Sequence, residues 1–249
     1  MDMDNRLKKW EGKVALVTGA TSGIGQSTAR ALAKLGMKLA ISGRRFERLR
    51  ELKTDFEELE IECIILVGDQ TEMDTNREFF HQIREKWGGI DVLINNAGTG
   101  GGQGMVDVDF KTINQCIDLN IRAAVTCMQE AVSDMCVKGE GAIVNISSLG
   151  GHRMISRPNS SAVYSASKHA LRIITDGLRS EMAAKKIPLK IALISPGMVD
   201  TEWHNRTRGE YEFEPLEAED VTDAVLYVLS TPPNVQVCDI LIRSVEQIV

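Results

Sequence analysis

The stretch KVALVTGATSGIG, residues 13–25, decides the fold. Residues 13–18 form a short apolar run typical of a buried strand, and the pattern after the turn predicts an amphipathic helix over residues 24–35. Glycines in such a turn let the backbone approach a pyrophosphate, and the start of the helix offers N–H groups to it. An ordinary glycine turn is the alternative, because the spacing is GxxxGxG and not GxGxxG. The candidate phosphate loop consists of Gly19, Thr21, Ser22, Gly23, Ile24 and Gly25.

Outward from this stretch, strand and helix alternate along the chain. Further strands are predicted at residues 37–42, 61–67, 90–94, 142–146, 189–194 and 235–242. Helices are predicted at residues 46–59, 71–87, 110–137, 161–186 and 217–229. This alternation predicts βαβ units, in which right-handed crossovers place helices on both faces of a parallel sheet. No linker or repeat divides residues 1–249, so we predict one doubly wound α/β domain of the Rossmann type.

Composition and charge argue against several other classes of protein. The 249 residues carry a formal net charge of −6 without a basic block, which disfavours nucleic acid and membrane surfaces as partners. The polar start MDMDNRLKKW and the lack of a long apolar run predict a cytoplasmic chain without membrane insertion. The five cysteines lack CxxC spacing and the four histidines are scattered, so we expect buried or inert thiols and no metal site.

Two arginines follow the second predicted strand. The residue that binds the adenosine ribose should lie about twenty residues past the glycine loop, where this chain has Arg44 and Arg45. Arginine favours a 2′-phosphate, so the cofactor NADP(H) is predicted over NAD(H). A solvated pair that opens a surface helix is the alternative. Asp69 could bind the adenine amino group or simply close a turn, and Asn amides could bridge loops near the cofactor. The candidate cofactor residues after the third and fourth strands are Asp69, Gln70, Asn96, Ala97 and Gly98.

Tyr164 and Lys168 form the candidate catalytic pair. Their i,i+4 spacing at the start of a predicted helix places both on one face. A phenol with a pKa near 10 is a poor base at neutral pH, but a nearby ammonium and a cofactor cation would favour the phenolate. Ser148 follows the fifth predicted strand and could hydrogen-bond a carbonyl oxygen as charge develops. A surface pair and a turn serine are the alternative interpretations.

Six motifs in this order resemble the short-chain dehydrogenase/reductase superfamily: TGATSGIG, NNAG, Asn120, the Ser148 region, YSASK and SPGMVDT. The resemblance implies hydride transfer between an alcohol and a ketone or aldehyde. It implies that Tyr164 is the acid/base and that Lys168 lowers its pKa and holds the nicotinamide ribose. Ser148 would orient the carbonyl, and Asn120 would hold a water for proton relay. Cofactor contacts after the sixth strand, including those to the nicotinamide carboxamide, would come from Pro196, Gly197, Val199 and Thr201.

The sequence indicates the substrate less clearly than the type of reaction. The ends of the chain are similar to a subgroup with farnesol-dehydrogenase-like and hydroxysteroid-reducing members, and also to bacterial 3-hydroxy acid dehydrogenases. A lipophilic alcohol or ketone fits that subgroup. A small 3-hydroxy acid would fit Arg206 or Arg208 as a carboxylate clamp, although a solvated loop also explains both arginines. Residues 149–163 are somewhat longer than the family pattern, and residues 202–215, the expected substrate lid, are short and charged.

Two further expectations concern the protein as a whole. A non-catalytic NADP-binding sensor or scaffold on the same fold is the competing hypothesis for its function. In the family that the motifs resemble, the two long helices usually form subunit interfaces, which implies a homodimer or homotetramer. The run Gly100 to Gly102 looks mobile, and no chemistry is assigned to it.

Overall fold

A seven-stranded sheet forms the centre of the computed structural model, which describes residues 3–72, 74–100, 104–154, 162–204 and 210–248. The strand order is β3-β2-β1-β4-β5-β6-β7, and every neighbouring pair is parallel. The strands are β1 Val14–Val17, β2 Lys38–Gly43, β3 Cys63–Val67, β4 Val92–Asn95, β5 Gly141–Ile146, β6 Leu189–Pro196 and β7 Asp239–Ile242. The doubly wound Rossmann-type sheet predicted from the sequence is therefore confirmed.

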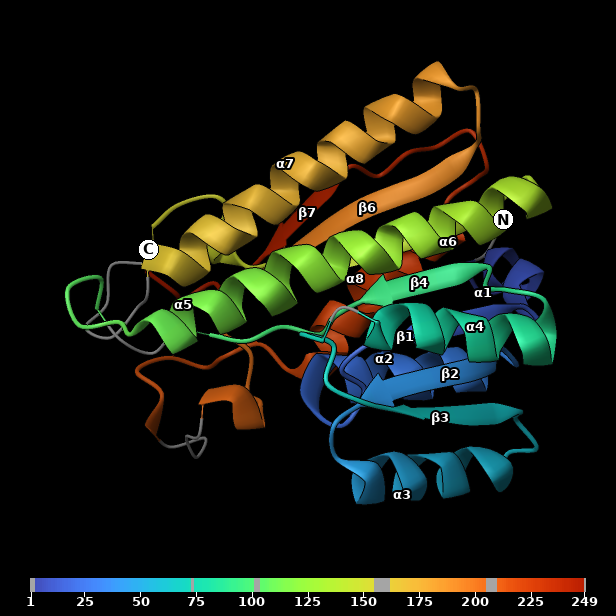
Figure 1. Ribbon diagram of the computed structural model, residues 1–249, viewed down its shortest axis with the longest axis horizontal. Helices are drawn as coiled ribbons and strands as arrows, with labels where there is room; N and C mark the ends of the chain where they lie inside the picture. The colour runs from blue at the N-terminus through green and yellow to red at the C-terminus, as the bar shows by residue number, and fades with distance from the viewer. Residues whose placement is uncertain (1–2, 73, 101–103, 155–161, 205–209, 249) are drawn as a thin grey trace.

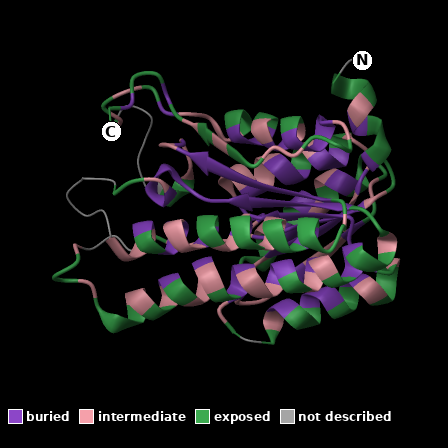
Figure 2. Ribbon diagram, turned by 90° about the horizontal axis from the view of Figure 1, so that it is seen from above, coloured by how far each residue is buried: buried purple, intermediate pink, exposed green. Residues whose placement is uncertain are grey.

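Helices cover both faces of this sheet, and Figure 1 shows α6 and α7 running across its front. The helices are α1 Met3–Leu7, α2 Gly23–Lys34, α3 Phe46–Glu57, α4 Thr75–Trp87, α5 Phe110–Ile117, α6 Ala124–Lys138, α7 Ala162–Ala184 and α8 Ala218–Ser230. One core cluster contains residues of α2, α3 and α8, and the other contains residues of α4, α6 and α7. Seen from above, the buried strands lie between these two helical layers (Figure 2).

The first strand shows why an uninterrupted apolar run was needed. Side chains alternate between the two faces of a strand. Ala15 and Val17 belong to the core cluster with α2 and α8, whereas Val14 and Leu16 belong to the cluster with α4 and α6. All four residues of β1 are buried. Because helices cover both faces, neither set of side chains can be polar.

The order of the strands reverses at β1, which pairs with β2 on one side and β4 on the other. The chain builds outward through β2 to β3, returns to β4, and continues through β5 and β6 to the edge strand β7. In open parallel sheets a ligand binds at this switch point, beyond the carboxyl ends of the strands. The loops that follow β1, β2, β4, β5 and β6 all begin at that edge.

Two predicted helices differ from the observed ones. The helix predicted at residues 110–137 is interrupted by a π-helical segment, Asp118–Ala123, between α5 and α6. Such segments are often found at functional sites. The helix predicted to start at residue 71 begins at Thr75 instead. Asp69 accepts hydrogen bonds from the backbone N and Oγ1 of Thr71, at 3.0 and 2.8 Å, and so closes a turn there.

The start of the last strand was predicted wrongly, and the cysteines fall into two groups. The last strand begins at Asp239 rather than at residue 235, because Val235 N donates to Pro232 O in a turn. The cysteines are all free, three of them buried, whereas Cys136 and Cys238 are exposed, so that these two are inert stays a prediction. Cys136 lies on α6 and Cys238 directly precedes the edge strand, and helices and edge strands both carry solvent-facing positions. Among the described residues, no helix combines the length and apolarity needed to cross a bilayer.

Candidate active site

The glycine loop after β1 is held by close backbone packing. Gly19 has a positive φ of 64°, a conformation that side chains disfavour. A Cβ at Gly25 would lie 2.4 Å from the carbonyl oxygen of Gly19 and 2.5 Å from Asn96 Nδ2. Gly25 is thus required by packing and does not line the neighbouring cavity, whereas Gly19 and Gly23 do line it. A cofactor contact from the backbone of Gly25 stays a prediction, whereas the space beside its Cα is filled by the chain itself.

Asn96 joins the loop after β4 to the glycine loop. Its Nδ2 donates to the carbonyl oxygens of Thr18 and Gly19 at 3.0 and 3.1 Å. The backbone N–H groups of Asn96 and Ala97 both donate to Thr18 Oγ1 at 2.9 Å. Of the two roles that the sequence left open for the Asn amide, the structure shows the bridge between loops. The side chain therefore holds the phosphate loop in shape from behind.

The N-terminus of α2 opens onto the cavity, which Ser22, Gly23 and Ile24 line. Ser22 occupies the N-cap position, but its side chain makes no capping hydrogen bond. Its Oγ instead accepts a hydrogen bond from Arg45 Nη2 at 2.7 Å. The first backbone N–H groups of this twelve-residue helix, and the positive end of its dipole, are thus offered to an anion in the cavity.

The two arginines after β2 differ in how firmly they are held. Arg45 donates from Nε and Nη2 to Thr21 Oγ1, at 3.0 and 2.6 Å, in addition to its bond with Ser22. Among the described residues, Arg44 makes only a long ion pair, 3.8 Å from its Nη1 to Asp69 Oδ2, and its side chain is 65% exposed. Arg45 is therefore not a freely solvated side chain, because it is tied to the phosphate loop.

Asp69 and Gln70 end the loop after β3 beside these arginines. The hydrogen bonds from Thr71 lower the pKa of Asp69, which stays ionised at neutral pH. Gln70 is buried, accepts from Ser42 Oγ at 3.3 Å and donates to Asn76 Oδ1 at 2.7 Å. Asp69 thus closes a turn, which was one of the two roles proposed for it from the sequence. Asp69 and Gln70 also line the cavity.

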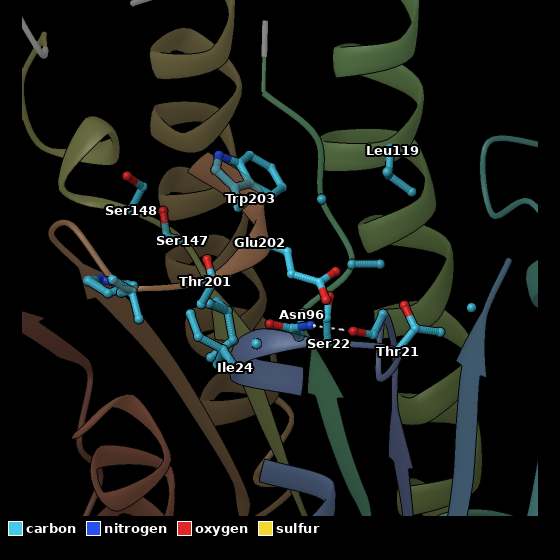
Figure 3. A pocket seen from close by; sticks show the side chains of 18 of the residues that line it. Thr21, Ser22, Ile24, Asn96, Leu119, Ser147, Ser148, Thr201, Glu202 and Trp203 are labelled. Carbon is cyan, nitrogen blue, oxygen red and sulfur yellow. Dashed lines mark hydrogen bonds between the residues drawn. The ribbon is translucent and has the colours of Figure 1, made fainter. Parts of the chain in front are cut away.

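A cavity of about 520 Å³ runs along the carboxyl edge of the sheet, from the arginines to the candidate catalytic residues. Figure 3 shows side chains from several loops converging on it, among them Thr21, Ser148 and Trp203. Predicted site residues that line it are Gly19, Thr21, Ser22, Gly23, Ile24, Arg44, Arg45, Asp69, Gln70, Asn96, Ala97, Gly98, Ser148, Tyr164, Lys168, Pro196, Gly197, Val199 and Thr201. Gly25 and Asn120 are the two that do not.

Ser148 and Tyr164 meet at one end of this cavity. Ser148 follows β5, and Tyr164 lies in the first turn of α7, so a strand end and a helix start bring them together. The two side chains share a hydrogen bond, which lowers the pKa of Tyr164. Burial raises that pKa more strongly, so the net direction is upward from the ordinary value of 10. The protein's own groups therefore keep the phenol protonated at neutral pH.

Lys168 lies one helical turn after Tyr164 and is 4% exposed. Its ammonium donates to the carbonyl oxygen of Ile146 at 3.0 Å and lies 5.9 Å from the centre of the Tyr164 ring. Burial lowers the pKa of Lys168 to about 8. That Lys168 lowers the pKa of Tyr164 stays a prediction.

Asn120, in the π-helical segment, lies behind the cavity and is 1% exposed. Its Nδ2 donates to Thr99 O at 2.8 Å and to Ser167 Oγ at 3.0 Å, while its Oδ1 accepts from Thr99 N at 2.8 Å. Both ends of the amide are engaged by the protein. Asn120 thus ties the loop after β4 to α7, next to Lys168, and its role in a proton relay stays a prediction.

Several cavity residues were missed by the sequence analysis. Glu202 and Trp203 directly follow Thr201, so their place after a recognised motif was a signal that could have found them. The Trp203 ring lies 6.1 Å from the Tyr164 ring at an angle of 52°. Gln247 had no such signal, and it reaches the site because its Oε1 accepts from Met198 N at 3.0 Å. The other missed residues are Gly43, Gly68, Leu119, Ile146, Ser147, Leu149 and Met198.

The described part of the chain contains no group of three or more His, Cys, Asp and Glu side chains that could hold a metal ion. Arg206, Arg208, Gly101 and Gly102 lie outside the described residues, so the expectations placed on them are not tested.

A parallel sheet with a glycine turn at its switch point, and a tyrosine and lysine at the same edge, is the arrangement of nicotinamide-dependent oxidoreductases. Within that class, a family model described as short chain dehydrogenase matches residues 13–212. The chain therefore belongs to the short-chain dehydrogenase/reductase family, as its motifs indicated. Members of this family are oxidoreductases that act on CH–OH donors and use nicotinamide cofactors.

Individual relatives match along nearly the whole chain. A farnesol dehydrogenase from Aedes aegypti is 38% identical over 244 residues, which are 97% of this chain and 99% of that protein. The dehydrogenase/reductase SDR family member 11 from Gallus gallus is 35% identical over 257 residues, with 97% and 100% covered. An alcohol dehydrogenase from the archaeon Thermococcus sibiricus, solved in complex with 5-hydroxy-NADP, superposes with a TM-score of 0.84 at 26% identity. The superposition covers 94% of this chain and 97% of that one.

Proposed function

We propose that this protein is an NADP(H)-dependent oxidoreductase that interconverts an alcohol and a ketone or aldehyde, with Tyr164 as its acid/base. One observation carries the proposal. A single cavity joins an arginine pair and a helix N-terminus to the hydrogen-bonded Ser148–Tyr164 pair, with Lys168 beside it. This arrangement has an anion-binding end and a proton-transfer end. The competing idea of a non-catalytic sensor gives no reason for a buried ammonium beside the tyrosine.

The residues present fit NADP(H). The helix N-terminus at Gly23 and Ile24 would hold the pyrophosphate, because its N–H groups are not capped by Ser22. Arg44 and Arg45 would hold the 2′-phosphate, since guanidinium groups bind phosphate oxygens in pairs. The Thermococcus relative was solved in complex with 5-hydroxy-NADP, which supports the same choice. At the other end, Pro196, Gly197, Val199 and Thr201 would contact the nicotinamide.

The chain's own residues would then transfer the proton to or from the substrate oxygen. When bound, the nicotinamide ring supplies or accepts the hydride. Tyr164 lies with its hydroxyl bonded to Ser148, so both hydroxyls can contact one substrate oxygen. Burial keeps the Tyr164 phenol protonated, which is the form that donates to a carbonyl oxygen. The buried ammonium of Lys168 would favour the phenolate left after that donation, and Asn120 would position the Lys168 helix through Ser167.

The substrate end of the cavity favours a lipophilic compound. Trp203 lies over Tyr164, and the buried side chain of Leu149 follows Ser148 directly. Apolar walls beside a few polar groups are typical of sites for hydrophobic ligands. The name of the Aedes relative points to the same class, a terpenoid alcohol. A small 3-hydroxy acid remains the alternative substrate class, and a substrate panel decides between them.

The test compares Tyr164→Phe with the wild type. We expect turnover to fall by about 10²- to 10⁴-fold, because the proton donor is lost, while NADPH binding stays within about twofold. Tyr227→Phe is the matched control, since Tyr227 lies 52% exposed on α8. The measurements are NADPH oxidation with a panel of terpenoid, steroid and 3-hydroxy acid carbonyl substrates, and fluorescence titration with NADPH and NADH.

Three outcomes would count against the proposal. Wild-type turnover retained in Tyr164→Phe would remove this residue as the acid/base. No oxidation of NADPH with any carbonyl of the panel would favour the sensor hypothesis. Tighter binding of NADH than of NADPH would overturn the choice of cofactor. A cytoplasmic location and a homodimer or homotetramer stay predictions, which fractionation and light scattering would test.

A further inference from the structure

Glu202 places a carboxylate between two arginines at the rim of the cofactor cavity. Its Oε2 lies 2.9 Å from Arg45 Nη1, and its Oε1 lies 2.5 Å from Arg48 Nη1. Arg48 is part of α3 and Arg45 precedes that helix, so Glu202 binds its N-terminal end. Figure 3 shows Glu202 beside Ser22, within the group of side chains that line the cavity.

The same arginine is the one best placed for a 2′-phosphate. The Nε and Nη2 groups of Arg45 are held by Thr21 and Ser22 of the phosphate loop, and its Nη1 is bonded to Glu202. Carboxylate and phosphate oxygens bind guanidinium N–H groups with the same geometry. A phosphate that bound Arg45 from the cavity would therefore compete with the carboxylate of Glu202.

The backbone keeps Glu202 within reach of these arginines. The preceding residue, Thr201, packs closely on the glycine loop, since a Cβ at Gly23 would lie 2.9 Å from Thr201 Cγ2. The following residue, Trp203, packs near Tyr164 and near Gly100, where a Cβ would lie 3.1 Å from the indole. Hydrogen bonds from Arg48 and Arg45 lower the pKa of Glu202, so it is ionised at neutral pH.

We infer that Glu202 sets cofactor selectivity: its carboxylate competes with the 2′-phosphate of NADP(H) for Arg45. This inference rests on the proposed use of NADP(H). Binding of a cofactor that carries the phosphate weakens the internal ion pair between Glu202 and Arg45, whereas binding of NAD(H) leaves it in place. The chain therefore binds NADP(H) less tightly than its arginines alone would allow, and the discrimination against NAD(H) is smaller in consequence.

The expected effect follows from the exposure of the two ion pairs. Side chains of Glu202, Arg45 and Arg48 are 53%, 44% and 40% exposed, so solvent screens both pairs. One screened pair changes a binding constant by up to about fivefold. In Glu202→Gln, NADPH should bind about two- to fivefold more tightly, with NADH unchanged within about twofold. The amide keeps the size of the side chain, and its exposed position makes a folding defect unexpected.

The experiment is a titration of wild type, Glu202→Gln and a charge-matched control with NADPH, NADH and 2′,5′-ADP, by fluorescence and calorimetry. Glu181→Gln is the control, because Glu181 pairs with Lys185 at the far end of α7 and is 56% exposed. It removes the same charge without touching the cavity. 2′,5′-ADP contains the 2′-phosphate without the nicotinamide, so it should show the same gain as NADPH in Glu202→Gln and none in Glu181→Gln.

Several results would overturn the inference. Unchanged NADPH affinity would mean that the ion pairs are ordinary surface pairs. Weaker binding of both cofactors would mean that Glu202 closes over the cofactor and stabilises it. An equal gain for NADPH and NADH would reveal a general effect of charge. The wild-type titration judges the proposed function separately, because a preference for NADH there contradicts NADP(H) use, whereas the variants test only the role of Glu202.

Discussion

Replacing Lys168 by methionine should stabilise the fold at neutral pH while it abolishes turnover. Methionine has a similar length and no charge, so it removes an ammonium that is 4% exposed. The pKa of Lys168 is about 8 in the fold against an ordinary value of 10.5. At about 1.36 kcal/mol per pH unit, keeping this group charged in the fold costs roughly 3 kcal/mol.

The hydrogen bond to Ile146 O opposes this gain. A charged donor contributes about 1.5–3 kcal/mol in such a bond, so the net gain at pH 7 should be about 1 kcal/mol. For a chain of this size that raises Tm by roughly 2–4 °C. The folded pKa lies below the unfolded one, so the penalty is full below pH 8 and disappears as pH rises towards 10.5. The advantage of the variant should therefore vanish at high pH.

Urea unfolding followed by circular dichroism between pH 6 and 10, without added cofactor, measures this difference. Lys185→Met is the control, since Lys185 is a 56% exposed lysine on the same stretch of chain. It should give no gain at any pH. A Lys168→Met variant less stable than wild type at pH 7, or a stability difference independent of pH, would show that burial of this ammonium is not costly. Full turnover in the variant would separately remove Lys168 from the chemistry.

Two other predictions test the packing of the loop and the state of the thiols. Gly25→Ala should destabilise the fold by about 1–3 kcal/mol and abolish NADPH binding, because its Cβ would lie 2.4 Å from a backbone carbonyl oxygen. Gly177→Ala, with no atom within 4 Å of its Cβ, should bind NADPH normally, and wild-type binding by Gly25→Ala would refute the argument. In Ellman's assay only the exposed Cys136 and Cys238 should react in the native state. Cys127 is buried and its pKa is raised to about 12, so it should react only after the protein unfolds. Rapid reaction of Cys127 in the native protein would contradict its burial.

The parts of the fold that could be predicted are those that leave a local trace in the sequence. A strand covered on both faces needs an apolar run, as residues 13–18 show. The ends of helices were harder to predict, because single side chains decide them. Asp69 closes a turn, so α4 begins four residues later than predicted. The residues of this turn fit the helical pattern that follows them, so the pattern did not indicate the later start.

The candidate site likewise has features that the sequence predicts and features that it does not. The carboxyl ends of parallel strands share one edge, so the topology alone implied that Ser148 and the glycine loop would lie at a common cleft. The sequence could not show that Asn120 turns inward to bind Thr99 and Ser167. A side chain's hydrogen-bond partners depend on the packing of several elements, and no spacing along one helix encodes them.

By itself, the sequence determined the doubly wound sheet, the glycine turn and the presence of a tyrosine and a lysine on one helical face. Apolar periodicity and residue spacing are local properties, and they can be read without a fold. Only the tertiary structure decided that Glu202 reaches Arg45, 157 residues away, and that Lys168 is buried deeply enough to lower its pKa to about 8. Distances between loops and the removal of water around a charge depend on all the surrounding atoms at once, so they arise only when the chain has folded.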